Sequence, residues 1–342
     1  MIEVKDVSKK YGSFEAVKDV SFSVGQEQVL GFLGPNGAGK TTIMKILTGY
    51  HLPSSGQVKI DGFPIEEAPL EIKKRIGYLP ETNPLYADMS PEEYLYFVAS
   101  SRLLPKGGRK KAVNEAIAAC GLEEARTQRI DSLSKGYKQR VGLAQAIIHD
   151  PPILILDEPT SGLDPNQIIE IRSLMRELGK RKTVILSTHI LQEVEAVCST
   201  VLILNEGRIA AQGTPEEIAQ TIRGLDTWEL HLKGAKVSDI ESRLARLERD
   251  TGEIKVESSG DGILQLGFVI RNSKTYSLDG ELIFDWALSQ GYKIIGMNRK
   301  KLSLEDIFVK LTSDEGRGKP LTSDEGRGKP LTNEPLNPKE GQ

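Results

Sequence analysis

A nine-residue glycine-rich segment constrains the fold of this chain more than any other feature. Its residues, Gly34 to Thr42, read GPNGAGKTT and satisfy the pattern G-x-x-x-x-G-K-[ST]. An apolar run typical of a strand, VLGFL, precedes the segment, and a helical pattern containing IMKIL follows it. A chance glycine-rich turn would lack these two flanking elements. The segment therefore predicts a parallel α/β domain in which backbone N–H groups and a helix N-terminus surround phosphate groups.

The side chains near the end of this segment indicate which groups it contacts. The Lys40 ammonium is expected to contact the β- and γ-phosphates of ATP, and the Thr41 hydroxyl is expected to ligate Mg²⁺. The expected phosphate-binding residues are Gly34, Pro35, Asn36, Gly37, Ala38, Gly39, Lys40, Thr41 and Thr42.

Two further predicted strands lead into residues suited to hydrolysis. The apolar run Ile153 to Leu156 is followed by Asp157 and Glu158. Because ligands of parallel α/β sheets bind at the carboxyl ends of the strands, Asp157 is expected to hold the magnesium ion and Glu158 to polarise the attacking water. Another run, Thr183 to Ser187, precedes His189, which is placed to reach the γ-phosphate. The presence of all three side chains argues against a P-loop protein that does not hydrolyse its nucleotide.

A second predicted helix N-terminus offers another anion site. The residues Leu133 to Tyr137 read LSKGY and precede a helical pattern that is expected to run to Pro151. Ser134 and Gly136 lie at the start of that helix, where unpaired N–H groups and the helix dipole favour negative charge. Since the phosphates already have one helix N-terminus, the second is most simply explained by a second nucleotide presented across a dimer interface.

Six motifs, in their order along the chain, resemble those of the ATP-binding cassette (ABC) family over residues 1 to about 222. GPNGAGKTT resembles the Walker A loop, LSKGY the signature motif and ILILDE the Walker B strand. Tyr11 resembles the aromatic residue that stacks on adenine, the segment Ser161 to Asp164 resembles the D-loop, and His189 resembles the switch histidine.

The resemblance implies an ABC-type P-loop NTPase fold and a head-to-tail pair of nucleotide-binding domains. Each ATP is then held between the Walker A loop of one chain and the signature of the other, so that Ser134 and Gly136 act in trans. By the same resemblance Glu158 is the general base and His189 senses the γ-phosphate. Asp164 is implied to be among the nucleotide-binding residues.

This chain departs from the family pattern at two motifs. In the signature, Lys135 and Tyr137 replace the second glycine and the glutamine of LSGGQ. The serine and the last glycine, which touch phosphate in the family, are retained, so ATP-driven closure is expected to be retained as well. In the segment Gly77 to Glu81, the acidic residue stands where the family has a glutamine. Glu81 is expected to reach Mg²⁺ through water and is included among the candidate catalytic residues.

The sequence after about residue 222 predicts a second, smaller domain. Its predicted elements are strands at 227–232, 253–257, 263–270 and 293–297 and helices at 237–249 and 280–290. Their order, βαββαβ, is that of a ferredoxin-like α+β sandwich, and a last helix is expected at 304–311. We therefore expect an ABC nucleotide-binding domain at 1–222, an accessory C-terminal domain at 223–311 and a disordered tail at 312–342. The tail contains TSDEGRGKPL twice in direct repeat and lacks the apolar residues that a core needs.

The composition of the chain bears on its partners and location. A formal net charge of -3 gives no electrostatic sign of a nucleic-acid partner. No run approaches the roughly 18 apolar residues of a spanning helix. We therefore expect a cytoplasmic protein that lies on the inner face of the cell membrane through a separate permease subunit. The other expected partner is a second copy of the chain or a homologous ATPase subunit.

The segments SKGYKQRVGLAQAI, STHILQEVEA and LEDIFVKLT resemble ATPase subunits of bacterial exporters of the gliding-motility and the drug or sodium efflux types. Two alternatives remain open from the sequence. One is an importer ATPase whose C-terminal domain binds a small regulatory molecule. The other is a non-transport ABC ATPase that acts on ribosomes or DNA, although the chain shows one cassette and neither heptads nor a basic patch. The cargo is not specified, because the permease selects it.

Overall fold

The computed structural model describes residues 2–215, 217–218, 225–233, 251–259, 263–271 and 280–300. The predicted helices at 237–249 and 304–311 and the predicted tail at 312–342 lie outside these residues. No helix in the described part is long and apolar enough to cross a bilayer.

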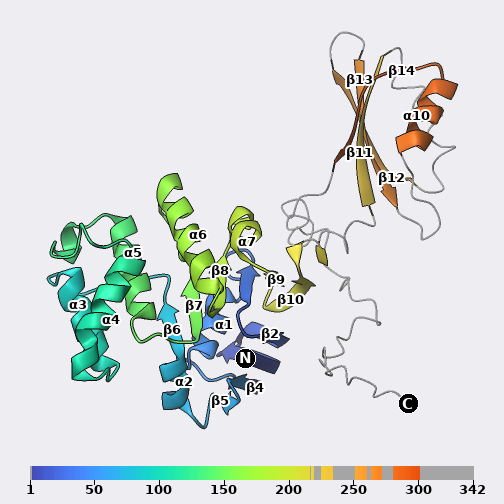
Figure 1. Ribbon diagram of the computed structural model, residues 1–342. Helices are drawn as coiled ribbons and strands as arrows, with labels where there is room; N and C mark the ends of the chain where they lie inside the picture. The colour runs from blue at the N-terminus through green and yellow to red at the C-terminus, as the bar shows by residue number, and fades with distance from the viewer. Residues whose placement is uncertain are drawn as a thin grey trace, which may run out of the picture.

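A six-stranded sheet forms the centre of the N-terminal region (Figure 1). In sheet order, its strands are β10 (Arg208–Gly213), β9 (Thr200–Asn205), β3 (Val29–Leu33), β8 (Thr183–Thr188), β7 (Ile153–Asp157) and β6 (Ile76–Leu79). Strand β10 is antiparallel to β9, and the other neighbours are parallel. Every residue of β3, β7 and β8 is buried, which explains their aliphatic runs. The three strands predicted from those runs are confirmed.

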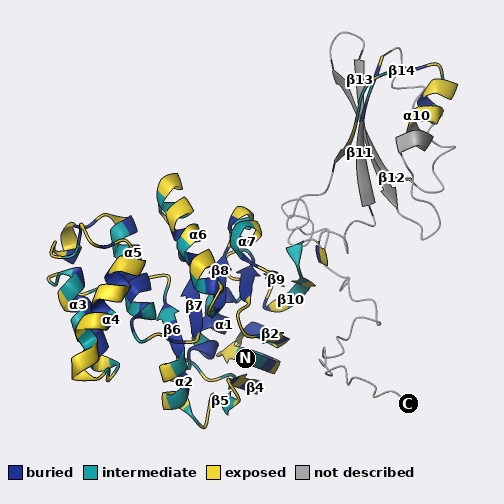
Figure 2. Ribbon diagram, in the orientation of Figure 1, coloured by how far each residue is buried: buried dark blue, intermediate teal, exposed yellow. Residues whose placement is uncertain are grey.

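Alternate side chains of these strands enter two hydrophobic clusters, one on each face of the sheet. Ile153 and Ile155 belong to one cluster, and Leu154 and Leu156 belong to the other. Figure 2 shows the strands as the buried centre of this region. On the Ile153 side lie α1 (Lys40–Leu47), α2 (Pro69–Arg75) and an antiparallel sheet of β2 (Phe14–Val24), β1 (Ile2–Tyr11), β4 (Ser55–Ile60) and β5 (Phe63–Pro64). On the Leu154 side lie α3 (Pro91–Ser101), α4 (Lys106–Ala119), α5 (Lys135–Ile147), α6 (Pro165–Gly179) and α7 (Leu191–Val197).

Helix α5 ends before the residue at which the sequence predicts its end. The expected terminus was Pro151, whereas the helix ends at Ile147. Asp150 has a φ of 50°, which no right-handed helix accommodates. Pro151 also disfavours helical geometry at the residue before it. The predicted boundary was therefore wrong by one turn, while the helix itself is confirmed.

His149 lies just beyond α5 and gives this region a pH dependence. Its Nε2 lies 3.1 Å from the carbonyl oxygen of Ile76, and burial lowers its pKa from 6.5 to about 4. As the pH falls through this range, the unfolded chain takes up a proton that the folded chain excludes, so up to about 3 kcal/mol of stability is lost. We expect His149→Gln, which keeps an N–H donor for Ile76, to lose less stability between pH 6.5 and about 4. Urea unfolding at a series of pH values measures this, and equal pH slopes for the two proteins would contradict it.

A second sheet follows in the C-terminal part of the chain. It consists of β12 (Thr251–Ser259), β13 (Ile263–Arg271), β11 (Leu225–Lys233) and β14 (Lys293–Lys300), in that order. All neighbours are antiparallel, and α10 (Gly280–Ser289) packs beside β14 (Figure 1). The first and third strands in the chain are central, and the second and fourth are at the edges, as in a ferredoxin-like sheet. The four predicted strands and the helix near 280–290 are confirmed.

Candidate nucleotide site

The glycine-rich loop joins β3 to α1 and requires its glycines at specific positions. A Cβ at Gly34 would lie 2.5 Å from the carbonyl oxygen of Leu204, and a Cβ at Gly39 would lie 2.7 Å from that of Ala16. Gly37 and Gly39 also have φ values of 84° and 104°, which side chains disfavour. No side chain caps the first turn of α1. The N–H groups at this helix start are thus available to an anion.

Lys40 is buried at the start of α1, with its amino group turned toward the loop. Its Nζ donates to the carbonyl oxygen of Gly34 at 2.7 Å and to that of Pro35 at 3.3 Å. The same Nζ lies 3.7 Å from Oε1 of Glu158. A cation therefore stands between the phosphate loop and the acidic end of β7.

Asp157 ends β7 and is paired in register with Ser187 of the neighbouring strand β8. Its Oδ1 accepts a hydrogen bond from the Ser187 hydroxyl and lies 3.5 Å from Oγ1 of Thr41. Its Oδ2 is buried, and none of the described residues forms a hydrogen bond with it. An orphaned carboxylate oxygen beside a hydroxyl matches the hard oxygen ligands that Mg²⁺ prefers, so this donor set fits the ion.

Glu158 has a conformation fixed by its backbone as well as by its side chain. Its φ is 48°, and its N–H donates to the carbonyl oxygen and the hydroxyl of Ser187, at 3.2 and 3.1 Å. Its Oε2 lies 2.9 Å from Nδ1 of His189, and the carboxylate is buried whereas the imidazole is half exposed. The backbone of Glu158 and the ring of His189 thus hold the carboxylate beside Lys40.

Burial dominates the electrostatics of the two carboxylates. It raises the pKa of Asp157, against hydrogen bonds from Ser187 and Thr41 that lower it. It also raises the pKa of Glu158, against the charges of His189 and Lys40. A carboxylate with a raised pKa is a stronger base, which is the property required of a group that takes a proton from water.

The structure places the signature residues apart from this cluster. Ser134 caps α5, and its hydroxyl accepts from the N–H of Tyr137 at 3.3 Å. Gly136 is buried so closely against Gln167 that an added Cβ would lie 2.4 Å from the amide carbon of that side chain. Within the described residues, no hydrogen bond or ion pair joins Ser134 or Gly136 to the phosphate loop.

The other three candidate residues lie at separate places in the fold. Tyr11 ends β1 with its ring partly exposed and 5.8 Å from the ring of His51. Asp164 caps α6, where its carboxylate accepts from the N–H of Gln167 at 3.0 Å. Glu81 is exposed just after β6, and its charge adds to the effect of burial in raising the pKa of Asp157.

Sequence reasoning missed the side chains that hold this cluster in place. The sequence predicts Ser187 only as part of a strand, although its hydroxyl hydrogen-bonds to both carboxylate-bearing residues. Gln139 is buried and donates to the carbonyl oxygen of Pro159 at 2.9 Å. A polar residue within an otherwise buried strand or helix face was the available signal for both.

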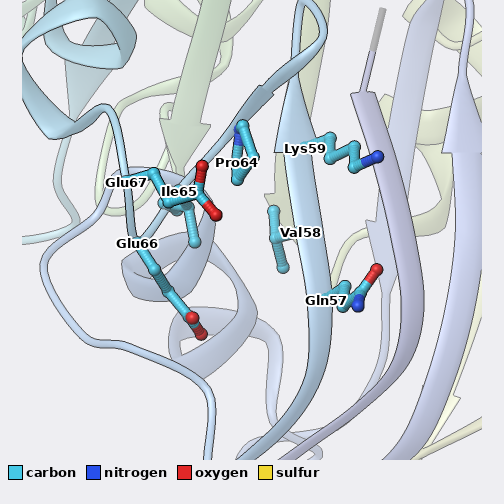
Figure 3. Close-up of a pocket in the computed structure, with 7 residues that line it drawn as sticks. All are labelled: Gln57, Val58, Lys59, Pro64, Ile65, Glu66 and Glu67. Atoms are coloured by element: carbon cyan, nitrogen blue, oxygen red, sulfur yellow. The ribbon is translucent and has the colours of Figure 1, made fainter.

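A pocket lies elsewhere, beside β4 and β5 (Figure 3). It is lined by Gln57, Val58, Lys59, Pro64, Ile65, Glu66 and Glu67. None of the candidate nucleotide-site residues takes part in it.

Comparison with known proteins agrees with this geometry. A family model described as ABC transporter matches residues 17–161. The chain is 42% identical over 220 residues to the ABC transporter ATP-binding protein YxlF of Bacillus subtilis (strain 168), covering 64% of this chain and 73% of that protein. It is also 33% identical over 315 residues to the bacitracin transport ATP-binding protein BcrA of Bacillus licheniformis, covering 91% and 97%.

The chain belongs to the ABC transporter ATP-binding proteins. A solved structure described as the ATP binding subunit of an ABC transporter is 32% identical, with a TM-score of 0.60, over 72% of this chain and 99% of that one. A second, a dimeric ATP-binding cassette in a post-hydrolysis state with ADP and Pi, is 25% identical, with a TM-score of 0.58, over 63% and 98%. The predicted ABC-type P-loop fold is confirmed, and the chain is an ATP-binding and ATP-hydrolysing subunit of this family.

Proposed function

We propose that two copies of this ABC subunit close around two ATP molecules and that the closure drives a separate membrane permease in export. Each ATP lies between the phosphate loop of one chain and the start of α5 in the other. Glu158 takes the proton from the attacking water, and His189 holds that carboxylate in place.

The separation of α5 from the phosphate loop carries this proposal. Ser134 and Gly136 form a helix N-terminus suited to an anion, yet within the described residues no hydrogen bond or ion pair joins them to the loop of their own chain. The side-chain amide of Gln167 in α6 lies against Gly136, so a side chain at this position would displace it. A second chain in head-to-tail orientation brings the phosphates of its ATP to this helix start.

Each residue of the site has a separate role in ATP hydrolysis. Lys40 neutralises charge on the β- and γ-phosphates, and the loop amides hold their oxygens. Thr41 and Asp157 would hold Mg²⁺, and Glu81 would reach it through water. The ion would supply positive charge to the phosphate oxygens. Because a carboxylate accepts the contact from His189, the Nδ1 of the ring carries the hydrogen. Tyr11 and Asp164 complete the nucleotide contacts at adenine and at the dimer interface.

The name of one relative, a Nod factor export protein, supports export. BcrA is named for bacitracin transport, and a Nod factor export protein of Burkholderia orbicola (strain AU 1054) is 30% identical over 92% of this chain and 97% of that protein. Both matches extend through the C-terminal sheet, so the architecture shared with the Nod factor export protein is a simpler explanation than an importer with an added domain. We place the chain at the inner face of the membrane through the permease.

Mixed dimers with two affinity tags test the arrangement in trans. One chain carries Lys40→Ala and the other Ser134→Arg, so that both changes fall in the same composite site if the signature acts across the interface. We expect one intact site, which retains one ATP per dimer after rapid gel filtration.

The matched control places both changes on one chain and pairs it with an unaltered chain. In the trans arrangement the control has two damaged sites and retains no ATP, whereas a signature acting within its own chain would give the opposite pattern. One ATP retained by the control and none by the split dimer would therefore refute the proposal.

A further inference from the structure

A fully buried acidic side chain in α7, Glu193, lies outside the residues assigned to hydrolysis. A buried carboxylate is costly unless hydrogen bonds satisfy it. Its Oε2 accepts from the Thr188 hydroxyl at 2.7 Å, and its Oε1 accepts from the Thr160 hydroxyl. Nη2 of Arg172 lies 3.9 Å from the same Oε1. The carboxylate is thus the meeting point of side chains from three other segments.

The two threonines lie in the two segments that carry the proposed hydrolytic side chains, Glu158 and His189. Thr188 is the residue before His189, and its hydroxyl oxygen also accepts from the N–H of Ile190 at 3.0 Å. Thr160 follows Glu158 by two residues and begins the turn into the Ser161–Asp164 segment, where its carbonyl oxygen accepts from Leu163 at 3.2 Å. The Glu193 carboxylate therefore links the segment that carries the proposed base, Glu158, to the segment that carries His189.

The segment after Glu158 is also held from its other side. Gln139 of α5 donates to the carbonyl oxygen of Pro159, the residue next to Thr160. The helix that carries Ser134 is in this way anchored to the same turn that Glu193 holds. Displacement of that turn would move both Glu158 and the start of α5.

We propose that Glu193 is a positioning residue that holds Glu158 and His189 in mutual register, through Thr160 and Thr188. The proposal rests on the proposed function, because it requires that the 2.9 Å contact between Glu158 and His189 contributes to ATP hydrolysis. A shift of about 1 Å in a catalytic group costs up to about 100-fold in rate. Among the described residues, no hydrogen bond joins either threonine side chain to the phosphate loop, so we expect ATP binding not to depend on this link.

Removal of each hydroxyl without loss of the branched shape tests the proposal. We expect Thr160→Val and Thr188→Val each to lower kcat roughly tenfold or more while KM for ATP stays unchanged. Thr160→Ser and Thr188→Ser keep the hydroxyl and should restore most of the rate. The double valine variant should lose little more than the worse single variant, because both act through the same carboxylate.

Thr183→Val is the matched control. Thr183 lies at the opposite end of β8, is buried, and donates through its hydroxyl to the carbonyl oxygen of Gly25 at 3.0 Å. It loses a part-buried hydroxyl hydrogen bond from the same strand, so its melting temperature should fall while its kcat stays at the unaltered level. An equal fall in kcat for Thr183→Val and Thr188→Val would mean that Glu193 has only a structural role.

Two further outcomes would overturn the proposal. One is an unchanged kcat in both threonine-to-valine variants. The other is a rise in KM in place of a fall in kcat. Glu193→Ala should reproduce the kcat of the double valine variant if it folds, and the threonine variants decide the matter if it does not. If Glu158→Gln loses turnover and the threonine variants do not, the positioning role of Glu193 is refuted and the proposed function still stands.

Discussion

Replacement of Glu158 by Gln is expected to reduce the turnover of ATP by roughly 100- to 10,000-fold. The substitution keeps the volume and the hydrogen-bonding reach of the side chain but removes the basic oxygen. The amide cannot accept the proton of the attacking water, whereas Lys40 and the loop amides are unaltered. ATP should bind with nearly unchanged affinity, and the unhydrolysed nucleotide should hold the two chains together.

Two measurements check this expectation. Phosphate release under saturating ATP gives the turnover, and size-exclusion chromatography with light scattering shows whether ATP and Mg²⁺ produce a stable dimer. Glu177→Gln is the control, because this exposed α6 residue is paired with Lys180 away from the site. A monomer that retains normal turnover in Glu158→Gln would show that another group serves as the base.

The second large effect is expected from Lys40→Ala, which should weaken ATP binding by about 30- to 150-fold. This range corresponds to loss of about 2–3 kcal/mol, the upper range for hydrogen bonds to charged groups. The amino group is buried among the carbonyl oxygens of Gly34 and Pro35 and has no replacement in the loop. Glu158 also loses its nearest lysine, so repulsion between that carboxylate and the γ-phosphate increases.

Equilibrium titration with a fluorescent ATP analogue measures the affinity. Lys45→Ala removes the same charge from the same helix, at a position outside the candidate site, and should leave the affinity within about twofold. An equal loss of affinity in both variants would mean that the general charge of α1, and not the position of Lys40, attracts the nucleotide.

Much of the candidate site followed from the sequence because its chemistry is local. The loop carries Lys40 and Thr41 within one strand-to-helix junction, and apolar strands deliver Asp157 and His189 to the same edge of a parallel sheet. These placements depend on secondary structure and on the direction of the strands. They need no knowledge of how individual side chains pack.

The supporting side chains could not be predicted in the same way. Glu193 meets Thr160 only after α7 has packed on the sheet, and the two residues are far apart in the sequence. The antiparallel sheet that contains β1 and β2 also escaped prediction, because register shifts interrupt the pairing of these strands. Long-range register and helix packing decide such contacts, and a pattern within one segment does not encode them.

The register of the central sheet determines where the chain can accept an inserted or deleted residue. Asp157 stands opposite Ser187, and Leu33 stands opposite Thr188, so the three segments of the site are aligned by continuous backbone pairing. Insertion of one codon within β8 would turn Ser187 to the other face of the sheet and would move His189 away from Glu158. Volume-conserving substitutions at the buried aliphatic positions of these strands are therefore tolerated, whereas insertions and deletions are tolerated only in connecting loops outside the site.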